Sequence, residues 1–279
     1  MKVLKIIFIA VFIAISTFNS QAQNVLDGLY TPEHNPVRTP VPYTYLRAAD
    51  VMWNKRIWRM IDVREKINHP LYYPLEPING RSSLFDVILQ GVREGSLITF
   101  NSLTDDFQVQ LTREDALLQL EKPRVTQQED PDNPGTYYEV YDTIKVSSRD
   151  IVAYEIKEDW FFDRQRSVLD VRIIGIAPII KTYDTETGEE RGQAKLFWLY
   201  FPNCRDIFAK SEVFNRANDA ERRTYEDIFW KRMFGSYITK ESNVYDRSVK
   251  DYALGMDALL EAERIKEDIF NLEMDLWHY

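Results

Sequence analysis

The spacing of apolar residues predicts an amphipathic helix that begins at Asp50. Four of them recur at i, i+4, i+7 and i+8, the repeat of one helix face: Trp53, Ile57, Met60 and Ile61. The other faces carry basic residues: Lys55, Arg56, Arg59 and Arg64. His69-Pro70 would end this helix, because proline lacks an N–H and restricts the residue before it. We expect the apolar face in the core, while the basic face is either solvated or a partner-binding surface.

The middle of the chain carries the clearest β pattern. Short polar turns separate three apolar runs, which predicts an antiparallel meander of Ile151–Phe162, Val168–Ile180 and Leu196–Phe201. Gly175 and Pro178 predict a bulge or an edge in the second run. The third run, LFWLYF, is apolar without alternation, so we expect it to be covered on both faces.

Further elements are predicted from capping residues and spacing. Ser82 or Ser83 would cap a helix that runs to Glu94 and stops at Gly95, and Thr112 would open another. Weaker strand patterns occupy Leu97–Phe100, Phe107–Leu111 and Tyr138–Val146, and weaker helical patterns occupy Asp206–Phe214 and Asp219–Phe234. The segment 122–136 is rich in proline and polar residues, which indicates an exposed loop.

A strong helix pattern begins at Met256. Its apolar positions repeat at 4, 3, 4, 3 and 4 residues, like the seam of a coiled coil: Ala258, Ala262, Ile265, Ile269, Leu272 and Leu276. Because the repeat is short, we expect it to pack on its own domain, with pairing to another chain as the alternative.

The N-terminus has the pattern of a secretory signal peptide over residues 1–22. Lys2 and Lys5 precede the apolar run Ile6–Ile15, which is too short to span a bilayer, and cleavage is expected after Ala22. Prolines at 32, 36, 40 and 42 then predict an extended arm over residues 23–42. This arm is either a disordered leader or a segment that orders on a neighbouring subunit.

Together these patterns predict an α+β fold. It would consist of an antiparallel β-meander with packed helices, a core over residues 43–240, the N-terminal extended arm and a C-terminal helical tail over residues 241–279.

Charge and cysteine content narrow the function classes. Signal removal would take the net charge from −9 to −11, because it removes Lys2 and Lys5. Such an acidic chain is poorly suited to nucleic-acid binding, which needs a basic surface. The one cysteine, Cys204, is expected to be a buried inert thiol, with an intermolecular bridge as the alternative.

The sequence carries few signs of catalytic chemistry. The three histidines lack the spacing of a zinc protease, and neither a nucleophile elbow nor a phosphate-binding glycine loop occurs. The best carboxylate set lies beside Trp160: Glu155, Glu158 and Asp159. Paired acids near an aromatic platform are typical of glycan-cleaving sites, yet acids on an outward strand face are far more often solvated. We therefore predict no catalytic residue, metal or cofactor.

Three stretches together carry a family resemblance. They are YTPEHNPVRTPVPYTYLRAADVMWNKRIWRMIDVREKINHPLYYPL, YEIKEDWFFDRQRSVLDVRIIGIAPI and LFWLYFPNCRDIFAKSEVFN. The chain resembles the GldN/PorN family of gliding-motility and type IX secretion proteins over roughly residues 30–237. The resemblance implies a periplasmic, non-enzymatic protein. It would self-associate in a ring with a lipoprotein (GldK or PorK) at the inner face of the outer membrane and contact a motor protein (GldM or PorM).

The residues predicted to anchor partners are aromatic or basic, and each could instead belong to the core. They are Trp53, Arg56, Arg59, Tyr72, Tyr73, Trp160, Phe161 and Phe162. The alternative function is a periplasmic glycan-binding or glycan-cleaving module built on Trp160.

Overall fold

The computed structural model describes residues 38–78, 80–129, 137–183, 190–215, 218 and 221–277. The expected signal peptide and arm residues 23–37 lie outside the described residues. The fold below belongs to the compact unit Val37–Tyr279. No helix among the described residues is long and apolar enough to cross a membrane.

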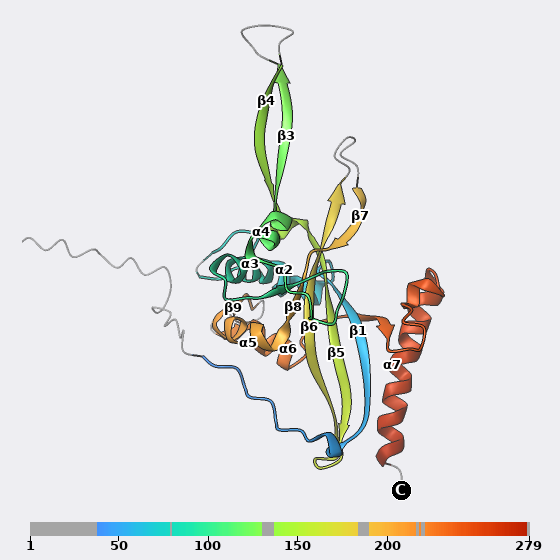
Figure 1. The fold of residues 1–279 in the computed structure, drawn as a ribbon. Coiled ribbons are helices and arrows are strands. Elements are labelled where there is room, and N and C mark those ends of the chain that lie inside the picture. Colours follow the sequence, from blue (N-terminus) through green and yellow to red (C-terminus); the bar gives the residue numbers. More distant parts are fainter. Residues whose placement is uncertain are drawn as a thin grey trace, which may run out of the picture. The chain divides into compact units, whose positions relative to one another are not determined.

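A seven-stranded antiparallel sheet organises this unit (Figure 1). Its strands run in the order β11-β1-β5-β6-β8-β2, and β7 pairs with β6. Their bounds are β1 Val51–Asp62, β2 Thr99–Phe100, β5 Ile151–Asp163, β6 Val168–Tyr183, β7 Glu190–Lys195, β8 Trp198–Tyr200 and β11 Tyr237–Glu241. The expected α+β fold with an antiparallel meander is confirmed.

The helix predicted from Asp50 is wrong, because this segment is the long strand β1. The strand is covered on both faces, with Ile57 and Ile61 buried on one side and Trp58 and Met60 on the other. Burial of both faces removes the polar–apolar alternation of a half-exposed strand, so the remaining spacing imitates a helix. Nor does His69-Pro70 end a helix: the short helix α2, His69–Tyr72, begins there, with Pro70 in its first turn.

The helices that carry capping residues are confirmed. Helix α3, Leu84–Glu94, is capped by Ser83 and ends at Gly95, whose φ of 76° lies in the left-handed region. Helix α4, Arg113–Leu120, is capped by Thr112. Two helices predicted from spacing alone have other bounds: α5 is Phe201–Lys210, and α6, which Thr224 caps, is Tyr225–Trp230. Helix α7, Met256–Trp277, begins where it was predicted to begin.

Three other expectations are corrected. The loop predicted at 122–136 begins as β3, Glu121–Glu129, which forms a hairpin with β4, Tyr137–Lys145. The predicted strand Phe107–Leu111 is an irregular segment with one bridge, from Gln110 to Phe100. Strand β8 is shorter than LFWLYF, because Phe201 already begins α5. A short pair, β9 Glu212–Val213 and β10 Arg223–Thr224, completes the strands among the described residues.

Helices cover one face of the sheet in two groups. Helices α3, α5 and α6 pack over Ile61, Tyr154 and Ile156 to form the main core. Helix α7 packs over Ile57 and Ile238 through the predicted seam. Three seam residues are buried there: Ala262, Ile265 and Ile269. Packing of the seam within its own domain is therefore confirmed.

The opposite face of the sheet is covered by the segment between β2 and α4. Phe107, at a left-handed φ of 58°, lies against Phe100, Trp198 and Tyr200. β6 makes room for it: the register shifts where Lys157 pairs with Gly175, which confirms the predicted bulge. A Cβ added at Gly175 would lie only 2.4 Å from the Cζ atom of Phe107.

Cys204 lies on α5 and is buried, as predicted, with 1% of its surface exposed. Its thiol donates a 3.4 Å hydrogen bond to the backbone carbonyl of Tyr200. Burial raises the pKa of this thiol far above its usual value, because the thiolate would be poorly solvated.

Candidate interaction cleft

The ladder between β1 and β5 brings six of the eight predicted anchors together. Trp53 pairs with Phe162, Lys55 with Trp160, and Arg56 with Asp159. Because strand side chains alternate, the anchors divide between the two faces of the sheet. The face that carries the helices receives four of them: Trp53, Arg59, Trp160 and Phe162. The opposite face receives Arg56 and Phe161.

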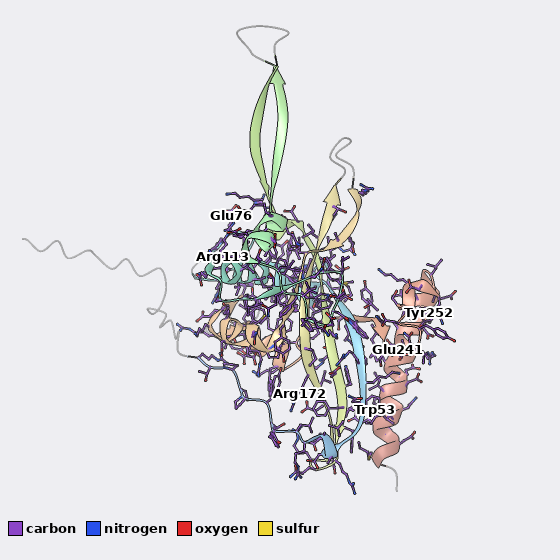
Figure 2. All side chains as sticks on the ribbon, viewed as in Figure 1. Trp53, Glu76, Arg113, Arg172, Glu241 and Tyr252 are labelled. Carbon is purple, nitrogen blue, oxygen red and sulfur yellow. The ribbon has the colours of Figure 1, made fainter. Side chains whose placement is uncertain are left out.

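The two tryptophans of this set face α7. Trp53 and Trp160 are partly buried and pack against the cluster that contains Ile265 and Ile269, so Trp53 lies between β1 and α7 (Figure 2). Phe161 and Phe162 are buried, with 3% and 8% of their surfaces exposed. The core alternative therefore applies to these two phenylalanines.

The basic anchors differ in their surroundings. Arg56 is exposed and forms a bidentate pair with Asp159 at 2.6 and 2.8 Å, across the strands. Arg59 donates to the Ser236 hydroxyl at 2.9 Å and to the Ser236 carbonyl at 3.1 Å. Burial lowers the pKa of Arg59, and neighbouring Arg232 adds to this effect while Glu158 opposes it.

Tyr72 and Tyr73 lie elsewhere, at the end of α2. Their rings meet edge to face with centroids 4.9 Å apart. Tyr72 packs against the main core, whereas Tyr73 is 44% exposed. The structure therefore separates this aromatic pair from the six anchors on β1 and β5.

A buried carboxylate lies at the centre of the helix-covered face. Glu158 has no exposed surface and accepts two bonds from the guanidinium of Arg232, at 2.8 and 3.1 Å. The indole of Trp160 donates a third bond to it, at 3.0 Å. The Arg232 guanidinium lies over the rings of Trp160 and Phe234, at 5.4 and 5.3 Å. The three bonds satisfy a charge that would otherwise be costly to bury.

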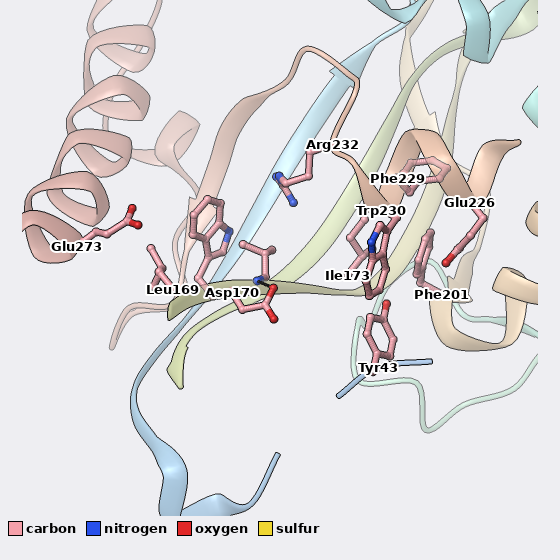
Figure 3. A pocket seen from close by; sticks show the side chains of 12 residues that line it. Tyr43, Leu169, Asp170, Ile173, Phe201, Glu226, Phe229, Trp230, Arg232 and Glu273 are labelled. Carbon is pink, nitrogen blue, oxygen red and sulfur yellow. Dashed lines mark hydrogen bonds between the residues drawn. The ribbon is translucent and has the colours of Figure 1, made fainter. Parts of the chain in front are cut away.

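A cleft of about 290 Å³ opens beside this carboxylate, where the cover by α5 and α6 gives way to α7 (Figure 3). Its walls are aromatic and apolar, with an arginine and three acids among them. The lining residues are Tyr43, Trp160, Leu169, Asp170, Val171, Ile173, Phe201, Glu226, Phe229, Trp230, Arg232 and Glu273.

Residues 38–46, which we call the strap, reach this cleft from the N-terminal side. The Tyr43 ring lies 4.0 Å from the Arg205 guanidinium and 5.6 Å from the Trp230 ring. Arg205 donates to the Val41 carbonyl, and Arg172 donates to the Thr44 carbonyl, each at 2.5 Å. Two arginines of the core therefore hold the strap through its backbone carbonyls.

A second buried ion pair supports the strap. Arg205 and Glu226 are 5% and 6% exposed, and the Nε of Arg205 donates to Glu226 at 2.9 Å. Burial raises the pKa of the Tyr43 hydroxyl, an effect that Arg205 opposes. Arg38 adds an ion pair with Asp227 at 2.7 Å.

Sequence reasoning missed most of these groups. Arg205, Trp230 and Arg232 come from segments far in sequence from the partners they meet, and no local pattern predicts such pairings. Arg232 has a left-handed φ of 51°, which is uncommon for a residue other than glycine. The one available signal was the aromatic and basic composition of the segment around Tyr43.

The acids predicted beside Trp160 do not converge. Glu158 points to the helix-covered face, while Glu155 and Asp159 point to the other, where they pair with Lys195 and Arg56. A glycosidase needs two carboxyl groups that flank one bond, an arrangement these three residues do not provide. In the described part of the chain, no group of three or more His, Cys, Asp or Glu residues could hold a metal ion.

The geometry thus gathers aromatic and charged side chains around one cleft. A family model described as "Gliding motility associated protein GldN" matches residues 46–278. The chain belongs to the GldN family. The match covers β1, β5 and α7, so the GldN-family region includes the predicted anchors and the C-terminal helix. None of the curated proteins compared with the chain matches it.

Proposed function

We propose that this GldN-family protein is a non-enzymatic structural component of the machinery for gliding motility and type IX secretion. It would form a periplasmic ring with a lipoprotein like GldK or PorK at the inner face of the outer membrane. It would also contact a motor protein like GldM or PorM and support protein secretion across the outer membrane.

The family match over residues 46–278 carries this proposal, because it spans the whole sheet and its helical cover. The chemistry of the site supports it. Trp, Tyr and Arg, the usual anchors of protein interfaces, gather around the cleft, and the arginines pair with acids. A ring also needs two different faces on each subunit, since neighbours meet head to tail.

The test is the mass of the complex formed by the signal-free protein and its lipoprotein partner. Co-expression and size-exclusion chromatography with light scattering should give a megadalton-scale particle that needs both chains. Two separate small species would reject the ring assignment.

The strap and the arm before it provide a second test. Deletion of residues 23–42 should weaken ring assembly by removing a contact to a neighbour, while the circular dichroism spectrum stays that of a folded protein. Particles of normal mass and yield from the deletion variant would exclude the arm from assembly.

A further inference from the structure

Helix α7 is apolar on two opposite sides. The inner side packs on the sheet through Ala262, Ile265 and Ile269. The outer side exposes five large apolar residues: Met256 (70%), Leu259 (55%), Leu260 (62%), Phe270 (58%) and Met274 (46%). A surface helix normally carries polar residues on its solvent side, so this outer side departs from the usual pattern.

Four of these residues follow a single line along the helix together with two glutamates, and Leu259 lies beside that line. Positions 256, 260, 263, 267, 270 and 274 repeat at 4, 3, 4, 3 and 4 residues, the spacing that presents one seam to another helix. The line has apolar residues at both ends and Glu263 and Glu267 in the middle. At 1.5 Å per residue it is about 27 Å long, which suits a partner helix of five turns.

Charge indicates which helix would fit. Helix α7 has seven acidic and two basic residues, a net charge of −5. Two copies of α7 packed by these faces would bring Glu263 and Glu267 of one against the same glutamates of the other, in either direction. Like charges in such a contact are unfavourable, so a second copy is a poor occupant. The ion pair of Glu263 with Lys266, 2.8 Å long and 58% exposed at both ends, is too exposed to neutralise the line.

We propose that the outer face of α7 docks an amphipathic helix of a partner protein, with apolar residues at both ends and Lys or Arg in the middle. The apolar ends would cover Leu260 and Phe270, and the central cations would pair with Glu263 and Glu267. This inference concerns a surface separate from the cleft and does not depend on the ring.

Two synthetic 22-residue helical peptides test the proposal against the full signal-free protein. Both carry leucines at the matching end positions, and they differ only in two central residues, lysine in one and glutamate in the other. By fluorescence anisotropy, the lysine peptide should bind at least tenfold more tightly than the glutamate peptide. Equal affinities would overturn the proposal.

Variants locate the binding surface. Phe270→Glu should weaken binding of the lysine peptide at least tenfold. The double variant Glu263→Lys, Glu267→Lys should bind the glutamate peptide more tightly than the lysine peptide. Leu118→Glu, at a 60% exposed leucine on α4, is the matched control and should change neither affinity. Each substituted residue is exposed, so the melting temperature of each variant should match that of the parent protein.

Self-association provides a separate outcome. If sedimentation shows a dimer that Phe270→Glu abolishes, the occupant is a second copy and the proposed partner is wrong. Unchanged binding of the lysine peptide to the Phe270→Glu variant would likewise show that the outer face of α7 is not the binding site.

Discussion

At the scale of single residues, Gly175 leaves the space that Phe107 fills. Its substitution by alanine would force the ring away, because the new Cβ would lie 2.4 Å from Cζ of Phe107 and 3.2 Å from Cε3 of Trp198. We expect Gly175→Ala to lower the free energy of unfolding by about 2 kcal/mol, as overpacking does. Urea denaturation measures this. In a Phe107→Ala background the same substitution should cost clearly less, because only the 3.2 Å approach to Trp198 remains, and an equal cost there would contradict the packing explanation.

Substitution of Glu158 tests how much its ion pair with Arg232, beside the cleft, contributes to stability. Glu158→Gln keeps the shape but leaves the guanidinium of Arg232 without a counter-charge, so the unfolding free energy should fall by about 3 kcal/mol. This is near the low end for buried pairs, because the Arg232 side chain is 31% exposed. The control Glu263→Gln removes a surface partner and should change stability by less than about 0.5 kcal/mol. Comparable losses of unfolding free energy in both variants would show that the buried carboxylate of Glu158 contributes no more to stability than a surface carboxylate.

Asp105 gives a dependence on pH. Burial alone would raise the pKa of its carboxyl, but the Lys157 ammonium at 3.3 Å and the Trp58 indole at 2.7 Å outweigh burial and lower it. A lowered folded-state pKa stabilises the fold above the unfolded value, and this contribution is lost as pH falls through the folded value. Asp105→Asn should therefore cost about 1–2 kcal/mol at pH 7, since it weakens charge-assisted bonds. The difference from the parent should shrink as pH falls below the usual carboxyl value of 3.8, as measured by urea unfolding at several pH values.

At the scale of elements, α7 has one stabilising side and one side free for contacts. Ile265→Ala should lower the unfolding free energy by about 3 kcal/mol, because Ile265 is fully buried against the sheet. Leu260→Ala, five residues earlier on the same helix, should stay within about 0.5 kcal/mol of the parent. Thermal unfolding of the two variants compares the sides directly, and equal shifts would contradict the assignment of inner and outer faces.

The elements also show where sequence reasoning succeeds. Helices α3 and α4 were predicted from Ser83, Gly95 and Thr112, since capping and left-handed glycine are local effects. Strand β1 was taken for a helix because burial on both faces comes from tertiary structure, which residue spacing does not reveal. The cleft was missed for a related reason: Arg232 meets Glu158 across 74 positions of sequence. Composition predicted which residue types form the surface, but the fold alone brings them together.

At the scale of the whole molecule, the strap is joined to the core mainly by polar and aromatic contacts. Most of its residues are exposed, and the ring of Tyr43 packs against the ring of Trp230. We expect Tyr43→Ala to release residues 38–46, seen as faster limited digestion by trypsin after Arg38, while β5 stays uncleaved. Tyr45→Ala, at an 87% exposed tyrosine of the same strap, is the control and should leave the digestion rate as it was. A digestion rate that does not change without the Tyr43 ring would show that the arginine contacts alone hold the strap.

The burial of Cys204 makes the molecule a convenient host for thiol-directed probes. The chain has one cysteine, and its thiol is enclosed and kept protonated, so maleimide reagents should leave the folded parent protein unlabelled. A cysteine introduced at an exposed position such as 118 or 260 would then be the single reactive site, with no need to replace Cys204. Spectroscopic distance measurements and site-directed cross-linking can therefore begin from the natural sequence, inside an assembly as well as in the isolated protein.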